Sequence, residues 1–134
     1  MFSYIEYKNI IELIKAKRRI CDFKDVLRFG HDIFCVLRHD IEFSIDRALS
    51  LARIEAHELG VVSTYTVQLR NNTYNALSQK NIEAIQEIKK LGHSIGLHQN
   101  PPPMGDDELV DYILKDIETL EHYYDFEVDR FAFH

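Results

Sequence analysis

The pattern of apolar positions predicts short strands that alternate with amphipathic helices over most of the chain. Runs of apolar and β-branched residues favour buried strands. We expect these strands at residues 34–38, 61–67, 94–97 and 129–134. Apolar residues that recur at spacings of three and four predict the intervening helices, at residues 44–59, 78–91 and 107–124.

Residues at the ends of these segments support the assignment. Ser44 is a good N-cap for the first helix, and Gly60 and Gly92 follow the first and second helices where a C-terminal glycine is common. Three consecutive prolines at residues 101–103 exclude regular structure before the last helix. Strands separated by helices imply parallel pairing through right-handed crossovers. The predicted fold class is therefore α/β, with parallel (β/α) repeats.

The first 30 residues do not follow the alternation. Ile10, Ile11, Leu13 and Ile14 indicate an amphipathic helix, while residues 20–30 form a connector of undefined structure. A chain of 134 residues suits a single hydrophobic core. We therefore predict one domain over 1–134, with a helical extension at 1–30 and a β/α part at 31–134.

Composition excludes several classes of partner and compartment. The formal net charge of -6 provides no basic surplus to neutralise nucleic-acid phosphates. No apolar stretch approaches the roughly 18 residues that a membrane span needs, and charged residues interrupt the N-terminus where a signal peptide would be apolar. Cys21 and Cys35 give no disulfide framework. These features predict a cytoplasmic protein without a membrane span or a nucleic-acid partner.

Polar residues of ligand type stand at the end of every predicted strand. They are the segment 38–42 (RHDIE), Gln68, His98 and His134. Active sites of parallel α/β sheets collect at these carboxyl ends. Asp40 and Glu42 are two residues apart and point to the same side of an extended chain, where a metal ion would relieve their repulsion. In the alternative interpretation, one carboxylate caps the helix after Ser44 and the other is solvated.

The histidines differ in their suitability as ligands. His98 stands at a strand exit and is the better candidate. His93 is an odd number of residues away, so it should face the other side of the strand and serve a structural role. His39 should likewise face away from its neighbour Asp40.

Three segments together resemble NodB-type polysaccharide deacetylases. Residues 36–44 (VLRHDIEFS) look like the first motif of the branch in which one apolar residue separates two acidic ones. Residues 91–98 (LGHSIGLH) are similar to the second motif, which ends on a metal-binding histidine. Residues 130–134 (RFAFH) look like the strand that leads to the next motif.

The resemblance implies a distorted (β/α) barrel and a divalent metal, usually zinc, in a hydrolase that acts on N-acetyl groups of sugars. Asp40 matches the family's general base, Glu42 its metal carboxylate and His98 its first metal histidine. A complete barrel needs about 200 residues or more, so the chain corresponds to an incomplete or truncated barrel. From these 134 residues alone we expect little or no turnover.

The second metal histidine of the family usually falls four residues after the first, and Pro102 stands there in this chain. Catalytic zinc normally has three protein ligands. His134 ends a parallel strand on the same rim as His98 and is our candidate for the third ligand. In the alternative interpretation, His134 is a frayed and solvated terminal residue.

Two classes of function remain open from the sequence. The first is a metal-dependent N-deacetylase-like hydrolase with a sugar or polysaccharide substrate. The second is a non-catalytic carbohydrate-binding or assembly relative that has lost the full metal site. An incomplete barrel leaves an open sheet edge, which residues 1–30 or a second copy in a homo-oligomer would cover.

Overall fold

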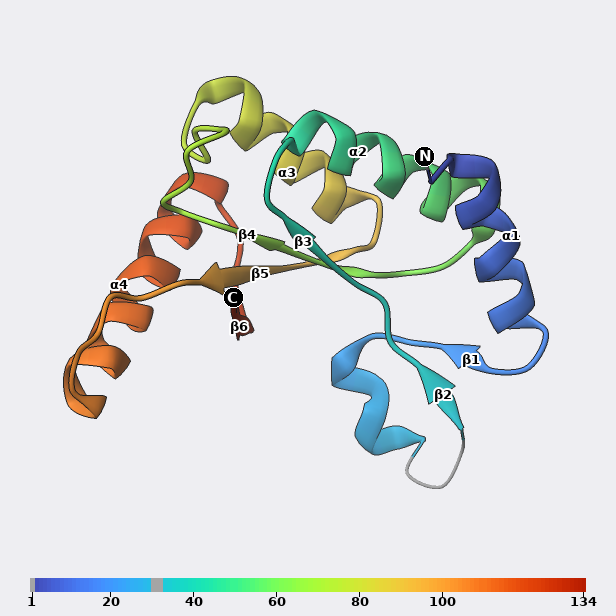
Figure 1. Ribbon diagram of the computed structural model, residues 1–134, viewed down its shortest axis with the longest axis horizontal. Coiled ribbons are helices and arrows are strands. Elements are labelled where there is room, and N and C mark those ends of the chain that lie inside the picture. The colour runs from blue at the N-terminus through green and yellow to red at the C-terminus, as the bar shows by residue number, and fades with distance from the viewer. Residues whose placement is uncertain (1, 30–32) are drawn as a thin grey trace.

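A computed structural model describes residues 2–29 and 33–134 of the chain, and it is an α/β structure with two parallel sheets (Figure 1). The larger sheet has the strand order β3-β4-β5-β6, and every neighbouring pair is parallel. Its strands are β3 (Arg38–Ile41), β4 (Thr64–Val67), β5 (Ser94–Gln99) and β6 (Phe131–Phe133). The predicted α/β class with parallel pairing is confirmed, and the sheet does not close into a barrel.

Three helices cover one face of this sheet. They are α2 (Ile45–Ile54), α3 (Gln79–Lys90) and α4 (Asp106–Tyr124). The strands turn alternate apolar side chains towards them, including Tyr65, Val67, Ile95 and Leu97, all at most 1% exposed. Because side chains alternate along a strand, polar residues between these positions point to the opposite face, where the candidate site lies.

The helix after β3 begins and ends as the sequence predicts, but its last turn differs. Ser44 caps α2 by accepting a hydrogen bond from the backbone of Arg47, and Gly60 ends the segment with φ at 63°. Between them, η2 (Glu55–Leu59) is a π-helix. Glu55, at the start of this turn, is fully buried, whereas its apolar neighbour Ala56 is only partly buried.

The first predicted strand, 34–38, is divided in the structure. Residues Phe34–Cys35 form β2, which pairs in parallel with β1 (Arg19–Ile20) in a separate two-stranded sheet. Strand β3 begins only at Arg38, because its pairing with β4 starts with Arg38 opposite Thr64. As a result Asp40 lies within a strand instead of after one, while Glu42 follows the strand directly.

The N-terminal segment contains the expected helix, α1 (Tyr4–Lys15), whose capping box joins Ser3 and Glu6. The connector contains β1 and a 3-10 helix, η1 (Phe23–Arg28), and its residue 30 lies outside the described residues. Within the described ranges, residues 2–29 do not pair with the larger sheet, so β3 and β6 remain edge strands there. No helix in these ranges is both long and apolar enough to cross a membrane.

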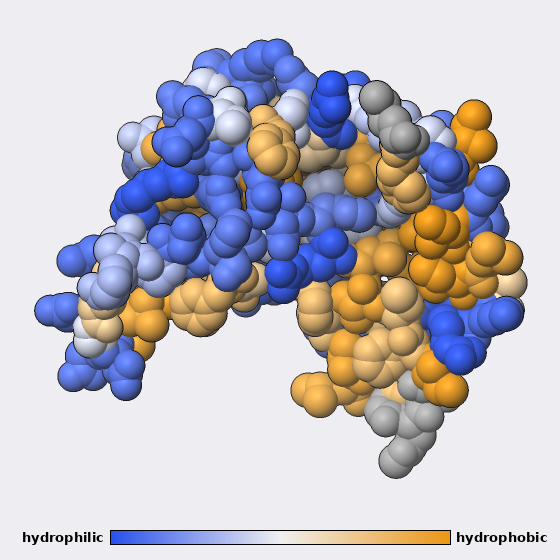
Figure 2. Space-filling view, viewed as in Figure 1, coloured by the Kyte–Doolittle hydropathy of each residue, from blue (hydrophilic) through white to orange (hydrophobic). Residues whose placement is uncertain are grey.

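The surface is hollowed between α4 and the lobe that contains β1, η1 and β2 (Figure 2). Apolar side chains gather on this lobe, and Phe23, Leu27 and Ile33 are among the exposed large hydrophobic residues. The helix-covered sheet therefore borders this hollow, with α4 on one side of it and the lobe on the other.

Candidate metal centre

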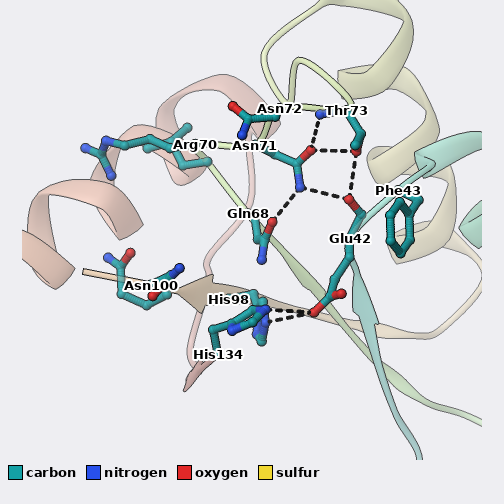
Figure 3. Close-up of a pocket in the computed structure, with 12 residues that line it drawn as sticks. Glu42, Phe43, Gln68, Arg70, Asn71, Asn72, Thr73, His98, Asn100 and His134 are labelled. Atoms are coloured by element: carbon teal, nitrogen blue, oxygen red, sulfur yellow. Dashed lines mark hydrogen bonds and ion pairs between the residues drawn. The ribbon is translucent and has the colours of Figure 1, made fainter. Parts of the chain in front are cut away.

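Glu42, His98 and His134 converge at the carboxyl ends of three different strands (Figure 3). Glu42 follows β3, His98 lies in β5, and His134 follows β6. Oε1 of Glu42 lies 3.1 Å from Nε2 of His134 and 3.8 Å from Nε2 of His98. One ligand atom from each residue lies within 4.8 Å of the other two.

The distances from Glu42 to the two imidazoles suit a metal ion held between these side chains. Atoms that bind zinc at about 2.0–2.2 Å lie about 3.3–3.6 Å apart when the geometry is tetrahedral. The two Glu42 distances, 3.1 and 3.8 Å, bracket that range. Two imidazoles and one carboxylate are also a donor set found in catalytic zinc sites.

His98 gives an independent indication of a missing partner. Its side chain is 2% exposed, and neither ring nitrogen has a hydrogen-bond partner. Buried polar atoms without partners are rare, since they lose their hydration without compensation. Burial lowers the pKa of His98, although the nearby Asp40 carboxylate opposes the shift. The imidazole is therefore held in the neutral form that binds metals.

Asp40 lies beside this group but is engaged by other residues. Arg38 donates two hydrogen bonds of 2.8 Å to its carboxylate, and the Thr66 hydroxyl donates one of 2.7 Å. Oδ1 of Asp40 lies 3.8 Å from Nδ1 of His98. Burial would raise the pKa of Asp40, but the bonds from Arg38 and Thr66 outweigh it and hold the pKa below its usual value. Asp40 is thus an ionised carboxylate at neutral pH.

The loop after β4 fixes the backbone of Glu42. The Asn71 amide and the Thr73 hydroxyl donate to the Glu42 carbonyl oxygen, at 3.0 and 2.7 Å. The Tyr74 hydroxyl donates to the preceding carbonyl, that of Ile41, at 2.7 Å. Three side chains of one loop therefore hold the point at which the chain leaves β3 and presents the Glu42 carboxylate.

The three candidate ligands all line one cavity of about 320 Å³. Polar side chains dominate the rest of its lining, and Phe43 stands at its edge, 75% exposed. Arg70 is held there by two hydrogen bonds to the buried Asp116 and stacks over Tyr112. The remaining polar residues of the lining are Gln68, Asn71, Asn72, Thr73, Gln99 and Asn100.

The other two histidines singled out in the sequence lie on the helix side of the sheet, as expected. His93 is buried, and its ring nitrogens lie 2.9 Å from the Ala52 carbonyl oxygen and 3.1 Å from the Ser63 amide nitrogen. His39 lies 2.7 Å from the Glu55 carboxylate. Both therefore join structural elements and do not reach the Glu42 cluster.

Two groups were not predicted from the sequence: the Arg38 partner of Asp40 at the site, and Glu55 on the opposite face of the sheet. The bond from Arg38 to Asp40 had a recognisable signal, because residues two apart on a strand share a side. Glu55 had none. It is fully buried and accepts hydrogen bonds from Tyr7 and Tyr65, whereas a glutamate in an amphipathic helix normally indicates an exposed position.

Comparison with known proteins returns no match: no family model fits the chain, and no curated protein or solved structure matches it significantly.

Proposed function

We propose that this chain provides the metal site of a zinc-dependent hydrolase that removes N-acetyl groups from a carbohydrate. Zinc would be held by Glu42, His98 and His134. The observation that carries the proposal is the buried His98 imidazole, which has no hydrogen-bond partner within the described residues and lies beside a carboxylate and a second imidazole. A bound cation would give these atoms the partner that the protein itself does not supply.

The residues around the triad support a hydrolytic role. Zinc, when bound, would polarise an acetamide carbonyl and lower the pKa of a water molecule. Asp40 is the nearest additional carboxylate and is kept ionised, the form that can accept a proton. The bonds from Arg38 and Thr66 also orient it, so its position does not depend on the substrate.

The cavity supports a carbohydrate as substrate. Its amide, hydroxyl and guanidinium groups can exchange hydrogen bonds with sugar hydroxyls, and the exposed Phe43 ring beside Glu42 offers an apolar face to a sugar ring. The three motifs that resemble NodB-type deacetylases point to the same substrate class and to a barrel-like parent fold.

A second candidate function is carbohydrate binding without catalysis. It is favoured by one observation: Arg38 and Thr66 already donate hydrogen bonds to the Asp40 carboxylate. These bonds lower the pKa of Asp40 and make it a weaker base. In that case the cavity would bind a sugar, but no acetate would be released.

Zinc titration of the purified chain tests the metal site first. We expect one zinc ion per chain, and at least tenfold weaker binding after His98→Ala or His134→Ala, because each change leaves two protein ligands. His122→Ala alters an exposed histidine of α4 and serves as the matched control. Binding that is unchanged in both ligand variants would contradict the proposal.

Acetate release then separates the two candidate functions. Because we expect little turnover from these 134 residues alone, the assay would use a zinc-loaded protein that contains the whole predicted barrel. It would be incubated with a panel of N-acetylated oligosaccharides, and both sugar binding and acetate would be measured. Zinc-dependent acetate release supports the hydrolase. Sugar binding without acetate, in the presence of bound zinc, supports the non-catalytic function.

A further inference from the structure

Arg130 joins the last strand to a residue near the start of the chain. Its guanidinium donates to both carboxylate oxygens of Asp22, at 2.6 and 3.0 Å, and to the Thr64 hydroxyl at 2.9 Å. Asp22 is 5% exposed, and the Arg130 side chain is 14% exposed. A bidentate ion pair of this kind has a well-defined geometry, so it fixes the position of the Arg130 guanidinium closely.

Strand β6, which follows Arg130 directly, has few other attachments. It has three residues and pairs only with β5 among the described strands. The side chains of Phe131 and Phe133 are about half exposed. Backbone bonds to β5 flank the strand, from the Leu97 amide to the Arg130 carbonyl and from the His134 amide to the Gln99 carbonyl. Because Phe131 and Phe133 are half exposed, side-chain packing contributes little to the position of β6.

Gly96 of β5 allows Arg130 to lie close to the sheet. A Cβ atom on Gly96 would come within 2.8 Å of Cγ of Arg130 and within 3.2 Å of its carbonyl oxygen. The arginine stem thus crosses β5 two residues before His98, on the same side of the strand. At the other end of β6, the His134 ring lies 5.2 Å from the His98 ring, measured between centroids.

We propose that Arg130, held by Asp22, is a positioning residue that places His134 within reach of the metal. The inference rests on the proposed metal site and deepens it. Arg130 fixes the first end of a short, poorly packed edge strand, and His134 stands at the other end. Without this anchor, β6 keeps its backbone bonds to β5 but loses the side-chain contact that fixes its first end, so the His134 imidazole is aligned less closely with Glu42 and His98.

Zinc titration of Arg130→Met tests this role. Methionine keeps an unbranched stem against Gly96 but removes the guanidinium. We expect zinc binding to weaken about tenfold, the lower end of the range seen when a group that orients a metal ligand is removed. Arg53→Met is the matched control: it also removes a bidentate ion pair, with Glu87, but on the surface between α2 and α3. The control should bind zinc as the unchanged chain does.

A double-mutant cycle with His134→Ala distinguishes positioning from a general loss of stability. If Arg130 acts through His134, then Arg130→Met has no further effect on zinc affinity once His134 is absent. An equal loss in both backgrounds overturns the inference, as does an unchanged affinity in Arg130→Met alone. Asp22→Asn, which is isosteric, repeats the test if Arg130→Met fails to fold.

The failure of this inference is distinguishable from that of the proposed function. If the unchanged chain binds no zinc, both are overturned. If it binds zinc through Glu42, His98 and His134 while Arg130→Met and Asp22→Asn bind equally well, only the positioning role is overturned. Melting temperatures of the metal-free variants establish that each is folded at the temperature of the titration.

Discussion

Oε1 of Glu42 lies 3.1 Å from Nε2 of His134, although the two residues stand on opposite edge strands of the four-stranded sheet. The contact is possible because parallel strands bring their carboxyl ends to one rim and because the two side chains extend toward each other (Figure 3). Both outer strands therefore contribute to a single site, together with His98 between them.

Different roles for Asp40 and Glu42 predict different outcomes for their amide variants. In a protein that contains the whole predicted barrel, Asp40→Asn should abolish zinc-dependent turnover while leaving zinc content nearly unchanged, because the change removes a proton acceptor and no ligand. Glu42→Gln should lower zinc content and turnover together, since a neutral amide is a much weaker ligand. Zinc analysis and acetate release on the same samples provide the comparison. Equal loss of zinc in both variants would contradict the assignment of roles.

The loop that holds the Glu42 backbone should affect zinc affinity without providing a ligand. Asn71→Ala removes the hydrogen bond to the Glu42 carbonyl and the acceptor of the Thr73 amide and hydroxyl. We expect zinc binding about tenfold weaker, because the ligand loses its support. Asn72→Ala changes the neighbouring residue, which also lines the cavity, and should have no such effect. Equal effects of the two variants would mean that the loop acts only through the cavity surface.

The substitution Gly96→Ala should destabilise the chain by about 1–3 kcal/mol, the usual cost of forcing extra volume into a close contact. The new methyl group would meet the Arg130 stem and backbone. Urea unfolding of the metal-free chain measures the change. In an Arg130→Ala background the stem is absent, so the same substitution should cost less. A cost that is equal in both backgrounds would place the clash elsewhere.

Buried Glu55 predicts a specific dependence of stability on pH. Burial would raise its pKa, but hydrogen bonds from His39, Tyr7 and Tyr65 outweigh this and lower the pKa from its ordinary value of 4.5. A carboxylate with a depressed pKa contributes stability that is fully present above 4.5 and is lost as the pH falls through the folded-state value. Glu55→Gln should therefore cost about 1.5–3 kcal/mol at pH 7, and progressively less below 4.5.

Unfolding free energies measured across this pH range check the prediction. Glu87→Gln is the control, because it alters an exposed ion pair with Arg53, and such pairs contribute at most about 1 kcal/mol. A cost of Glu55→Gln that does not change with pH would show that the glutamate contributes through its shape and hydrogen bonds, and not through its charge.

The alternation of strands and helices was predictable because the helices have apolar stripes and several of their ends are marked by capping residues. Ser44 and Gly60, for example, mark the two ends of one helical segment in the sequence and in the structure. The division of residues 34–38 between two sheets was not predictable. It depends on where β3 begins to pair with β4, a tertiary property that an apolar run does not encode.

The candidate site was likewise predictable only in part. Two-residue spacing predicted that Asp40 and Glu42 share a side, and both lie near His98. Arg130 and Asp22 were not predicted, because their contact joins distant parts of the chain at the opposite ends of the strands from the metal ligands. Patterns along the sequence locate residues on one strand, but they do not reveal which distant charge will hold that strand in place.

The polar residues of strand β3 have fixed partners on both of its sides, and this affects which pairing of the strand is stable. On one side Asp40 meets Arg38 and Thr66, and on the other His39 meets the buried Glu55. A one-residue slip against β4 would exchange the two sides. It would bury the Asp40 carboxylate among apolar helix residues and leave Glu55 without its imidazole partner. Unpaired buried charge is severely destabilising. Electrostatics thus disfavours the misaligned pairing, in addition to the cost of exposing Ile41 to water.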